Sequence, residues 1–534
     1  MKNEKVNEFH RHRTLKELLT FGAETYSEDP AFLYKEKKEE VVVSYRKFKE
    51  DVDGLGTWFY RNGYKNCRIA VFGENSYQWI LAHFAATCGK NVIVPIDKDM
   101  PSEGIVELLE DSECRFMIYS DQYEDVAQAV NSMNPEKVRQ CNMKLLTELV
   151  EEGRKLIGAG YLEYVQEEIK EDDLASIVYT SGTSGKSKGV MMSHRNFCSN
   201  TYGSCDAVDI KRGTALLLLP LHHTFGLVTN VFSPIAYGYP LYINRSLKRL
   251  LPDIQDVKPY LLCLVPLMIE VMHKKIWETA RKEGKDVTLR RMMKFSDILL
   301  KCGIDVRRKL FKPVLDGFGG NLELIVSGGA PIDEKYIRDF RSLGIIVQNG
   351  YGITECGPVV AVTRGKFPTI GSVGTPLCCN QIKISKEGEI LVKGENVMLG
   401  YYHNEEENRK AFDGEWLRTG DLGHIQNGEL YITGRIKNLI ILSNGENISA
   451  ESIEDEIYSN IPYVKEVIAY GENGAIVAEV YLDEEKADAK ERIHEDIRAL
   501  NKQLPQVKTI GKVVIRDTEF PKTSTKKIKR YKER

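Results

Sequence analysis

The sequence predicts an α/β protein with a large first domain and a smaller α+β domain at its C-terminal end. Three observations support this expectation. The 534 residues exceed the roughly 250–300 over which a single hydrophobic core keeps growing, so two or more domains are expected. Strand-like and helix-like stretches alternate through much of the chain. After Arg435 a new and shorter pattern of strands and helices begins.

The strand-like runs of the first domain are short, apolar and separated by helix-like stretches. This alternation is typical of βαβ units and of a largely parallel sheet. The expected strands cover residues 67–73, 91–97, 175–181, 215–221 and 322–329.

From about residue 371 the pattern changes to short strands and glycine turns. Glu387-Gly388 and Asn427-Gly428 predict antiparallel hairpins. Beyond Arg435 we expect a strand over 438–448, a helix over 449–460, two more strands, a helix over 489–504 and a basic tail. The expected domains are therefore residues 1–434 and 435–534.

The composition limits the class of protein. Hydrophobic residues make up 42% of the chain and charged residues 28%, and the mean hydropathy is -0.32, as in soluble globular proteins. A formal net charge of -3 gives no general reason to expect a nucleic-acid partner. The N-terminus has no apolar signal core, and no apolar run reaches the about 18–20 residues of a membrane span. The eleven cysteines form no CxxC pair, which favours reduced thiols and a cytoplasmic location.

The stretch YTSGTSGKSKG, residues 179–189, raises the question of phosphate binding. Gly185-Lys186-Ser187 matches the GK[ST] part of a Walker A loop. That motif also requires a glycine five positions before Gly185, and this position is occupied by Thr180. Glycines free the backbone so that successive N–H groups can face an anion, and Lys186 and Lys188 add positive charge. A Gly/Ser surface loop without a ligand is the alternative, and the loop alone does not decide between them.

Six further segments follow in a fixed order, and together with the loop they resemble the adenylate-forming superfamily of acyl-CoA synthetases, luciferases and peptide-synthetase adenylation domains. The segments are PLHHTFG (220–226), SGGAP (327–331), NGYGITECGP (349–358), RTGDLG (418–423), GRIKNLIILSNGENISAESIE (434–454) and PKTSTKKIKR (521–530). The resemblance implies a large multi-layered α/β N-terminal domain with a small β-barrel-like part, and a mobile C-terminal domain. It also implies that ATP and Mg²⁺ activate a carboxylic acid as an acyl-adenylate, with release of pyrophosphate.

The resemblance assigns the nucleotide site residue by residue. Thr354 would bind the α-phosphate, Glu355 would hold Mg²⁺, and Tyr351 would offer its ring to adenine. Asp421 would accept hydrogen bonds from the ribose hydroxyls, and Arg435 would reach the same ribose. The remaining nucleotide-binding residues are Thr180, Ser181, Gly182, Thr183, Ser184, Gly185, Lys186 and Lys188 of the phosphate loop, with Gly329, Ala330, Asn349, Gly350 and Gly352.

The C-terminal segment PKTSTKKIKR has two interpretations. By composition it is a solvated basic tail. By resemblance its Lys527 is the catalytic lysine that bridges the attacking carboxylate and the α-phosphate. Lys526 stands where glycine is usual in the family, so the local turn departs from the family pattern. Lys437 matches the hinge about which the C-terminal domain rotates before thiol attack.

The segment 220–226 bears on which acid is activated. By resemblance, the peptide-synthetase branch usually has an aspartate in this segment that pairs with the ammonium group of an amino acid. Here the segment contains no Asp or Glu, so the ammonium group of an α-amino acid would lack a counter-charge. The resemblance is closest to long-chain fatty acyl-CoA synthetases, and it places His223, Phe225, Gly226, Gly328 and Gly329 at the acyl pocket. The apolar residues after His223 fit either an acyl tunnel or ordinary core; they are Phe225, Leu227, Val228, Val231 and Phe232. A structural histidine is the alternative for His223.

The thiol that receives the acyl group is left open by the sequence. The first expectation is CoA, giving a fatty acyl-CoA synthetase that releases AMP. A carrier-protein phosphopantetheine is the alternative acceptor, and an aryl acid is the alternative substrate. A non-catalytic nucleotide-binding protein on the same fold is the third class. Long-chain acids partition into bilayers, so a peripheral membrane contact is compatible with the sequence, although no segment marks it.

Overall fold

The computed structural model describes residues 11–36, 39–134, 137–181, 187–210, 213–244, 249–442, 447–472, 475–483, 488–522, 528 and 530. The chain divides into two compact units, one of Met1–Gln381 with Val392–Glu415 and one of Ile382–Leu391 with Trp416–Arg534. The α/β class and the difference in size between the two parts are confirmed. The boundary between residues 434 and 435 marks where rotation is expected, and it stays a prediction.

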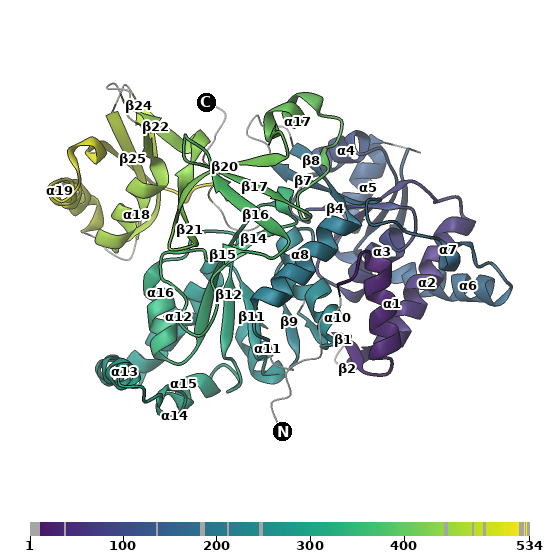
Figure 1. The fold of residues 1–534 in the computed structure, drawn as a ribbon, viewed down its shortest axis with the longest axis horizontal. Coiled ribbons are helices and arrows are strands. Elements are labelled where there is room, and N and C mark those ends of the chain that lie inside the picture. Colours follow the sequence, from purple (N-terminus) through teal and green to yellow (C-terminus); the bar gives the residue numbers. More distant parts are fainter. Residues whose placement is uncertain are drawn as a thin grey trace. The chain divides into compact units, whose positions relative to one another are not determined.

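The largest sheet of the first unit has seven strands in the order β18-β8-β7-β4-β3-β5-β6, of which Figure 1 labels β8, β7 and β4. Neighbouring strands from β7 to β6 run parallel, while β8 and β18 are antiparallel additions at one edge. The expected strands over 67–73, 91–97 and 175–181 are therefore confirmed as β3, β4 and β7. The strands are β3 (Arg68–Phe72), β4 (Val92–Ile96), β5 (Cys114–Tyr119), β6 (Arg139–Asn142), β7 (Leu174–Ser181), β8 (Ser187–Ser193) and β18 (Gly400–Tyr401).

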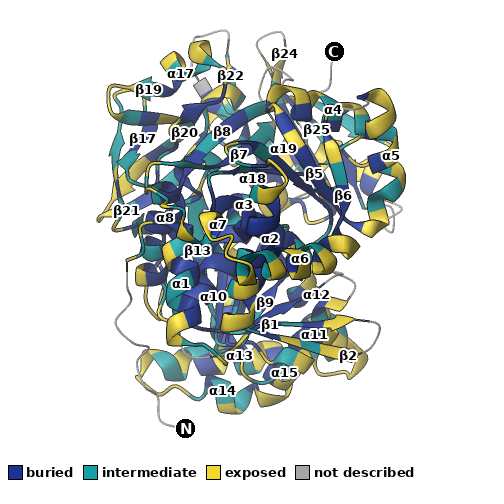
Figure 2. Ribbon diagram, turned by 90° about the vertical axis from the view of Figure 1, so that its right-hand side faces the viewer, coloured by how far each residue is buried: buried dark blue, intermediate teal, exposed yellow. Residues whose placement is uncertain are grey.

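Helix α3 (Tyr77–Thr87) packs against β3 and β4 and is buried along nearly its whole length, as its dark blue colour in Figure 2 shows. Its sequence, YQWILAHFAAT, is apolar on almost every side, which is typical of a helix enclosed by other elements. The side chain of Ser76 caps its first turn by accepting a hydrogen bond from the backbone N–H of Trp79 at 3.2 Å.

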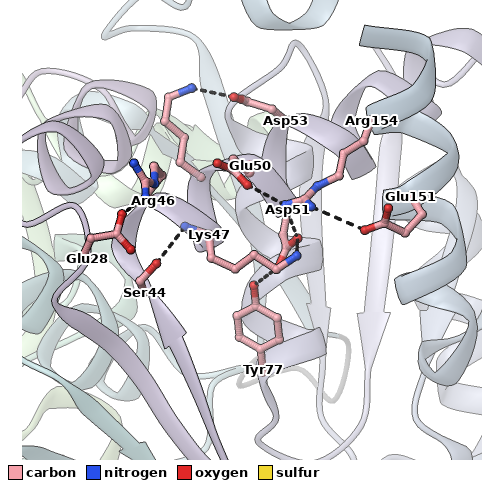
Figure 3. Close-up of polar contacts among 11 residues, drawn as sticks. Glu28, Ser44, Arg46, Lys47, Glu50, Asp51, Asp53, Tyr77, Glu151 and Arg154 are labelled. Atoms are coloured by element: carbon pink, nitrogen blue, oxygen red, sulfur yellow. Dashed lines mark hydrogen bonds and ion pairs between the residues drawn. The ribbon is translucent and has the colours of Figure 1, made fainter. Parts of the chain in front are cut away.

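Helices α2 (Tyr45–Arg61) and α6 (Leu146–Gly158) meet at two glycines. A Cβ atom at Gly153 would lie 1.8 Å from the carbonyl oxygen of Gly54, so the two backbones approach too closely for any side chain there. Beside this contact, the carboxylate of buried Asp51 accepts hydrogen bonds from Tyr77 at 2.7 Å and from Arg154 at 3.1 Å (Figure 3). Small residues and a paired buried charge thus join the two helices.

The four-stranded sheet of the first unit has the order β2-β1-β10-β9. Only the first three residues of the expected strand 215–221 pair in it. The chain leaves the sheet before Pro220, whose nitrogen has no hydrogen to donate to a neighbouring strand. The strands are β1 (Pro30–Glu36), β2 (Glu39–Ser44), β9 (Ala215–Leu217) and β10 (Leu241–Ile243).

A five-stranded sheet in the order β11-β12-β13-β14-β15 completes the first unit. The parallel strands β11, β12 and β13 share a large apolar core with α12 and α16, and β12 confirms the strand expected over 322–329. The strands are β11 (Leu261–Leu264), β12 (Leu324–Ser327), β13 (Ile346–Gly352), β14 (Val359–Val362) and β15 (Thr375–Pro376).

The remaining elements of the first unit are mostly helices. Within the described residues no helix is long and apolar enough to cross a membrane. All eleven cysteines are free thiols, and a cytoplasmic location stays a prediction. The helices are α1 (Leu15–Thr25), α4 (Ser102–Asp111), α5 (Glu124–Met133), α7 (Glu163–Gln166), α8 (His194–Ala207), α9 (Thr224–Leu227), η3 (Val228–Phe232), α10 (Ser233–Tyr237), α11 (Leu250–Val257), α12 (Pro266–Lys282), α13 (Asp286–Lys301), α14 (Arg307–Leu310), α15 (Lys312–Asp316), α16 (Glu334–Ser342) and α17 (Glu405–Ala411), with the short elements η1 (Asp121–Tyr123), η2 (Met143–Leu145), η5 (Thr354–Cys356) and β19 (Phe412–Asp413).

The second unit begins with an antiparallel hairpin and ends in a small α+β part. Asn427 and Gly428 both have positive φ, as a type I′ turn requires, and join β20 to β21 as the sequence predicts. The predicted strand over 438–448 is two paired strands, β22 and β23, and a parallel strand after α19, β26, was not predicted. The elements are β16 (Asn380–Ile384), β17 (Glu389–Gly394), β20 (Trp416–Gln426), β21 (Glu429–Arg435), η6 (Ile436–Asn438), β22 (Leu439–Ile441), β23 (Asn447–Ser449), α18 (Ala450–Asn460), β24 (Val464–Glu472), β25 (Ala475–Leu482), α19 (Ala489–Asn501), η7 (Gln506–Lys508) and β26 (Ile510–Arg516).

Candidate functional site

The predicted phosphate loop connects two antiparallel strands at the edge of the seven-stranded sheet. The pairing of β7 with β8 places Thr180 opposite Lys188 and Ser181 opposite Ser187. The hairpin therefore brings three of the predicted nucleotide-binding residues, Thr180, Ser181 and Lys188, together at its end. The central residues Gly182, Thr183, Ser184, Gly185 and Lys186 lie outside the described residues.

Lys188 is held from two sides by residues that the sequence did not single out. Its ammonium group pairs with the carboxylate of Glu407 on α17, and it lies 5.1 Å from the centroid of the Tyr401 ring. Both neighbours are distant in sequence. Tyr401 reaches this place because β18 pairs with β8, which puts Tyr401 opposite Val190.

Tyr401 also connects the hairpin to the predicted magnesium ligand. Its hydroxyl donates a hydrogen bond to Oε1 of Glu355 at 2.9 Å, and the Tyr401 side chain is almost fully buried. Burial and the adjacent Glu355 carboxylate raise the pKa of Tyr401 far above its ordinary value, so the hydroxyl keeps its proton and remains a donor. Lys188, Tyr401 and Glu355 thus form one continuous set of contacts in the first unit.

The YGITE segment lies where β13 ends and the single turn η5 begins. A Cβ atom at Gly352 would lie 2.0 Å from the carbonyl oxygen of Pro358, so only glycine fits there. The turn after Glu355 is fixed by two buried amides, because Asn200 and Asn396 each donate hydrogen bonds to the carbonyl oxygens of Cys356 and Val359. Thr354 and Glu355 are therefore presented on a rigid turn.

The carboxyl ends of β12 and β13 carry buried polar atoms. Strand register places Ser327 opposite Asn349, next to Gln348. Oγ of Ser327 and Oε1 of Gln348 are buried and have no hydrogen-bond partner within the described part of the chain. The carboxyl ends of parallel strands are the usual ligand-binding edge of an open α/β sheet. Ser327 begins the SGGAP segment, whose Gly329 has φ +83° and whose Ala330 is half-buried.

Two of the predicted acyl-pocket residues touch each other. A Cβ atom at Gly328 would lie 2.8 Å from Cζ of Phe225, so the absence of a side chain at Gly328 makes room for the Phe225 ring. Gly226 is equally constrained, since a Cβ atom there would lie 2.4 Å from the carbonyl oxygen of Pro220. This packing gives physical reasons for both glycines.

The histidine pair beside this packing differs in exposure. His223 is half-buried, and its ring centroid lies 4.2 Å from that of His222. His222 is buried, its Nε2 lies 3.5 Å from a carboxylate oxygen of Asp97, and burial lowers the pKa of His222 below its ordinary value. His222 was not among the predicted site residues.

The residues proposed for an acyl tunnel are deeply buried. Leu227, Val228, Val231 and Phe232 lie in α9 and η3. The Phe232 ring packs against the rings of His83, Phe84 and Phe197, which is the arrangement expected of an ordinary core residue.

The second unit pairs the two residues predicted for ribose. Nε of Arg435 lies 2.6 Å from Oδ1 of Asp421, and the two residues are opposite each other in the β20–β21 pair. Asp421 is 2% exposed. The RTGD turn before it is fixed by β17, since Oε1 of Glu389 accepts a hydrogen bond from the N–H of Gly420 at 3.0 Å. Glu389 was not predicted, because it lies outside the RTGDLG segment.

Lys527 and Lys526 lie outside the described residues, but the positions on both sides are anchored. Lys522 and Ile528 form an antiparallel bridge, and Lys522 pairs with Glu466. The guanidinium of Arg530 donates to both carboxylate oxygens of Glu454, with a 2.6 Å hydrogen bond to Oε1. The predicted hinge residue, Lys437, is exposed in the single turn η6.

The fold and this set of segments define an enzyme class, and the comparison with protein families identifies it. Residues 20–402 match the family described as AMP-binding enzyme, and residues 437–533 match the AMP-binding enzyme C-terminal domain. The chain therefore belongs to the AMP-binding enzyme family, which confirms the resemblance to the adenylate-forming superfamily.

Curated relatives and solved structures agree with this assignment. The chain is 27% identical over 431 residues to the long-chain-fatty-acid–CoA ligase FadD15 of Mycobacterium bovis, covering 76% of this chain and 71% of the relative. It is 28% identical over 478 residues to long-chain-fatty-acid–CoA ligase 1 of Homo sapiens, covering 81% and 68%. Among solved structures, o-succinylbenzoate CoA synthetase from Bacillus subtilis has a TM-score of 0.76 at 22% identity, with 96% of each chain covered.

Proposed function

We propose that this protein activates a carboxylic acid with ATP and transfers the acyl group to the thiol of CoA. In the first step a carboxylate oxygen bonds to the α-phosphorus of ATP, and the bond to pyrophosphate breaks. In the second step the thiol sulfur bonds to the acyl carbon, its proton is lost, and AMP departs. The names of the curated relatives support CoA as the acceptor and a long-chain fatty acid as the acid.

The observation that carries the proposal is the set of contacts from Lys188 through Tyr401 to Glu355. It joins the hairpin of the phosphate loop to the turn that bears the α-phosphate and magnesium residues. Catalysis of nucleotidyl transfer depends on positioning and on charge stabilisation more than on a protein nucleophile. Among the solved structures of similar fold, one contains ATP and a magnesium ion and another contains AMP.

Glu355 fits a magnesium site that is completed by the nucleotide. Among the residues that the structure describes, no three His, Cys, Asp or Glu side chains lie close enough to hold a metal ion. Mg²⁺ is commonly bound by one or two carboxylates together with phosphate oxygens, which suits a single glutamate on a rigid turn. When bound, the ion would neutralise phosphate charge, while Tyr401 orients the Glu355 carboxylate.

The other residues take the roles that their chemistry allows. The hydroxyl of Thr354 would donate to the α-phosphate, and the ring of Tyr351 would lie against adenine. The carboxylate of Asp421, oriented by Arg435, would accept from the ribose hydroxyls. Lys527 would bridge the carboxylate and the α-phosphate as a mobile cation.

The pocket residues favour an acid whose chain, apart from the reacting carboxylate, is uncharged and apolar. The segment 220–226 has no carboxylate to pair with an ammonium group, and Phe225 packs directly on Gly328. The proposed substrate is a medium- or long-chain fatty acid whose carboxylate lies beside His223. Activation of an aryl acid, or transfer of the acyl group to a carrier protein, would modify this proposal.

The test is ATP–pyrophosphate exchange over a panel of acids without any thiol. The panel runs from acetate to long saturated chains and adds benzoate, a hydroxycinnamate and amino acids. Exchange that peaks on medium or long alkyl chains supports the proposal, and thioester formation with free CoA against a purified carrier protein then identifies the acceptor. Exchange that peaks on aromatic acids would show that the substrate is an aryl acid instead of a fatty acid. Absence of exchange with every acid, despite ATP binding, would contradict the proposed activity.

A further inference from the structure

One exposed face of helix α13 combines positive charge with large apolar side chains. We call it the α13 face and define it by Val287, Arg290, Arg291, Lys294, Phe295, Ile298 and Lys301. The apolar members are strongly exposed, at 56% for Val287, 56% for Phe295 and 60% for Ile298. Exposed apolar side chains are ordinary one at a time, but three along one helix face indicate an interaction surface.

Helical geometry gathers these residues on one side. Their spacings of three, four, seven and eight residues lie within one side of a helix with 3.6 residues per turn. The opposite side is packed, because Leu289, Met293 and Ser296 are buried and α13 contacts α12 and α16. The hydroxyl of Ser296 lies 3.3 Å from the carbonyl oxygen of Ser342 on α16. Figure 1 shows α13 at the margin of the first unit, near α14 and α15.

The α13 face contains no acidic residue. Asp286 is the first residue of the helix, and Asp297 lies toward the packed side, where Oδ2 accepts a hydrogen bond from Ser342 at 2.8 Å. Within the described residues Arg291, Lys294 and Lys301 form no ion pair, and Arg290 lies over the ring of Trp277 at 4.9 Å. The cations of this face are therefore available to an external partner.

The surrounding sequence strengthens the positive charge. Residues 281–312 contain eleven Lys and Arg against four Asp and Glu, although the whole chain has a formal net charge of -3. Two further exposed apolar side chains lie nearby. Ile304, 52% exposed, follows α13 directly, and Phe367, 58% exposed, has its ring 5.9 Å from the guanidinium of Arg307. The charge is thus concentrated in the region that also exposes apolar groups.

We propose that the α13 face docks this protein on the surface of an anionic lipid bilayer. Apolar side chains on a helix at the edge of a protein can enter the interface between headgroups and acyl chains, while Lys and Arg extend to the lipid phosphates. A second copy of the chain using the same face would bring like charges together, which disfavours that occupant. The proposal rests on α13 and not on the identity of the activated acid.

The experiment measures co-sedimentation of the full chain with vesicles. Mixed phosphatidylcholine and phosphatidylglycerol vesicles are compared with pure phosphatidylcholine vesicles, at low and high salt. We expect binding to the mixed vesicles that falls as salt rises. Each cation near such a surface contributes about fivefold in partitioning, so Arg291→Glu with Lys294→Glu is expected to weaken binding by at least roughly 25-fold. Phe295→Ser with Ile298→Ser is expected to weaken binding at both salt concentrations.

Matched variants separate this face from general effects of charge and apolar exposure. Lys155→Glu with Lys386→Glu changes the net charge equally at two other exposed positions, and Val42→Ser with Ile425→Ser removes exposed apolar groups elsewhere. Both control variants are expected to bind vesicles as the wild type does. The proposal is wrong if the wild type does not bind mixed vesicles, if the α13 variants bind unchanged, or if the α13 variants alter only self-association or capture of an acidic carrier protein. ATP–pyrophosphate exchange without vesicles is expected to be unchanged in the α13 variants, so this test and that of the proposed function can fail separately.

Discussion

The guanidinium of Arg435 lies 2.6 Å from the carboxylate of Asp421, directly across the β20–β21 strand pair. Asp421 is nearly inaccessible to solvent, and the hairpin ends in the turn at Asn427 and Gly428. A charge-assisted hydrogen bond of this kind fixes the orientation of an acceptor carboxylate. The two residues proposed to bind ribose are therefore held together as one ion pair within the β20–β21 hairpin.

This pairing predicts that Arg435→Gln weakens ATP binding. Without the guanidinium, Asp421 loses the partner that orients it, and the KM for ATP is expected to rise about tenfold, the effect of losing one charged hydrogen bond. Steady-state exchange at varied ATP measures the change. Arg516→Gln is the matched control, because Arg516 also pairs across strands, with Glu479 at 2.6 Å, but outside the proposed site. An equal rise in both variants would assign the effect to general damage of the second unit.

Tyr401→Phe tests the proposed link between the phosphate hairpin and the magnesium ligand. The variant removes the hydroxyl that donates to Glu355, so the carboxylate becomes less well oriented. We expect the Mg²⁺ concentration for half-maximal exchange to rise about five- to tenfold, with little loss of thermal stability. Tyr402→Phe is the neighbouring control, since its hydroxyl donates to Glu113 instead. An unchanged Mg²⁺ dependence in Tyr401→Phe would contradict the proposal that Tyr401 orients the magnesium ligand.

Lys437→Pro and Lys527→Ala are expected to separate the two half-reactions. Proline fixes φ at the proposed hinge, so adenylate formation persists while thioester formation is lost. Lys527→Ala is expected to lose about 100-fold or more in adenylate formation, yet still consume supplied acyl-adenylate with thiol. Exchange and single-turnover thioester formation measure the two steps, and Lys437→Ala is the control that keeps the backbone free. Equal loss of both steps in Lys437→Pro, or normal exchange in Lys527→Ala, would contradict the assignments.

His194 is expected to make the fold sensitive to acid. It is 1% exposed, its Nδ1 accepts the backbone N–H of Leu15 at 3.2 Å, and burial lowers the pKa of His194 to about 4. In the unfolded chain the same group binds a proton near pH 6.5. Between these values the unfolded state binds more protons, so the stabilising contribution is complete above about pH 6.5 and is lost as the pH falls toward 4. The loss amounts to about 3 kcal/mol.

Urea unfolding of the wild type and of His194→Asn over this pH range measures that contribution. Asparagine keeps an acceptor near the Leu15 amide but does not titrate, so the variant is expected to lose less stability on acidification. The same slope in both proteins would show that other groups cause the acid sensitivity.

The contact between α2 and α6 predicts a steric effect at Gly153. Because a Cβ atom there would lie 1.8 Å from the carbonyl oxygen of Gly54, Gly153→Ala forces the helices apart. We expect the free energy of unfolding to fall by about 1–3 kcal/mol. Gly158→Ala in the same helix has open space around its Cβ atom and is expected to leave stability unchanged or raise it by up to about 1 kcal/mol. Thermal unfolding distinguishes the two variants, and equal effects would argue against the close contact.

Several elements could be predicted because their causes are local. A few adjacent residues specify each of these elements, which are the apolar strands β3, β4 and β7 and the Asn427-Gly428 turn. Strand β26 was missed because it follows a helix in a basic region, and it forms only by pairing with β25. The expected strand over 438–448 proved to be two strands that pair with each other.

Short motifs in a fixed order were enough to predict the family and most of the proposed site residues. Only the packing of distant segments places Tyr401 and Glu407 beside Lys188, and Glu389 against the RTGD turn. The physical reason is that these partners are brought together by strand pairing and helix packing between distant segments. Their spacing in the sequence therefore carries no local signal of their contact.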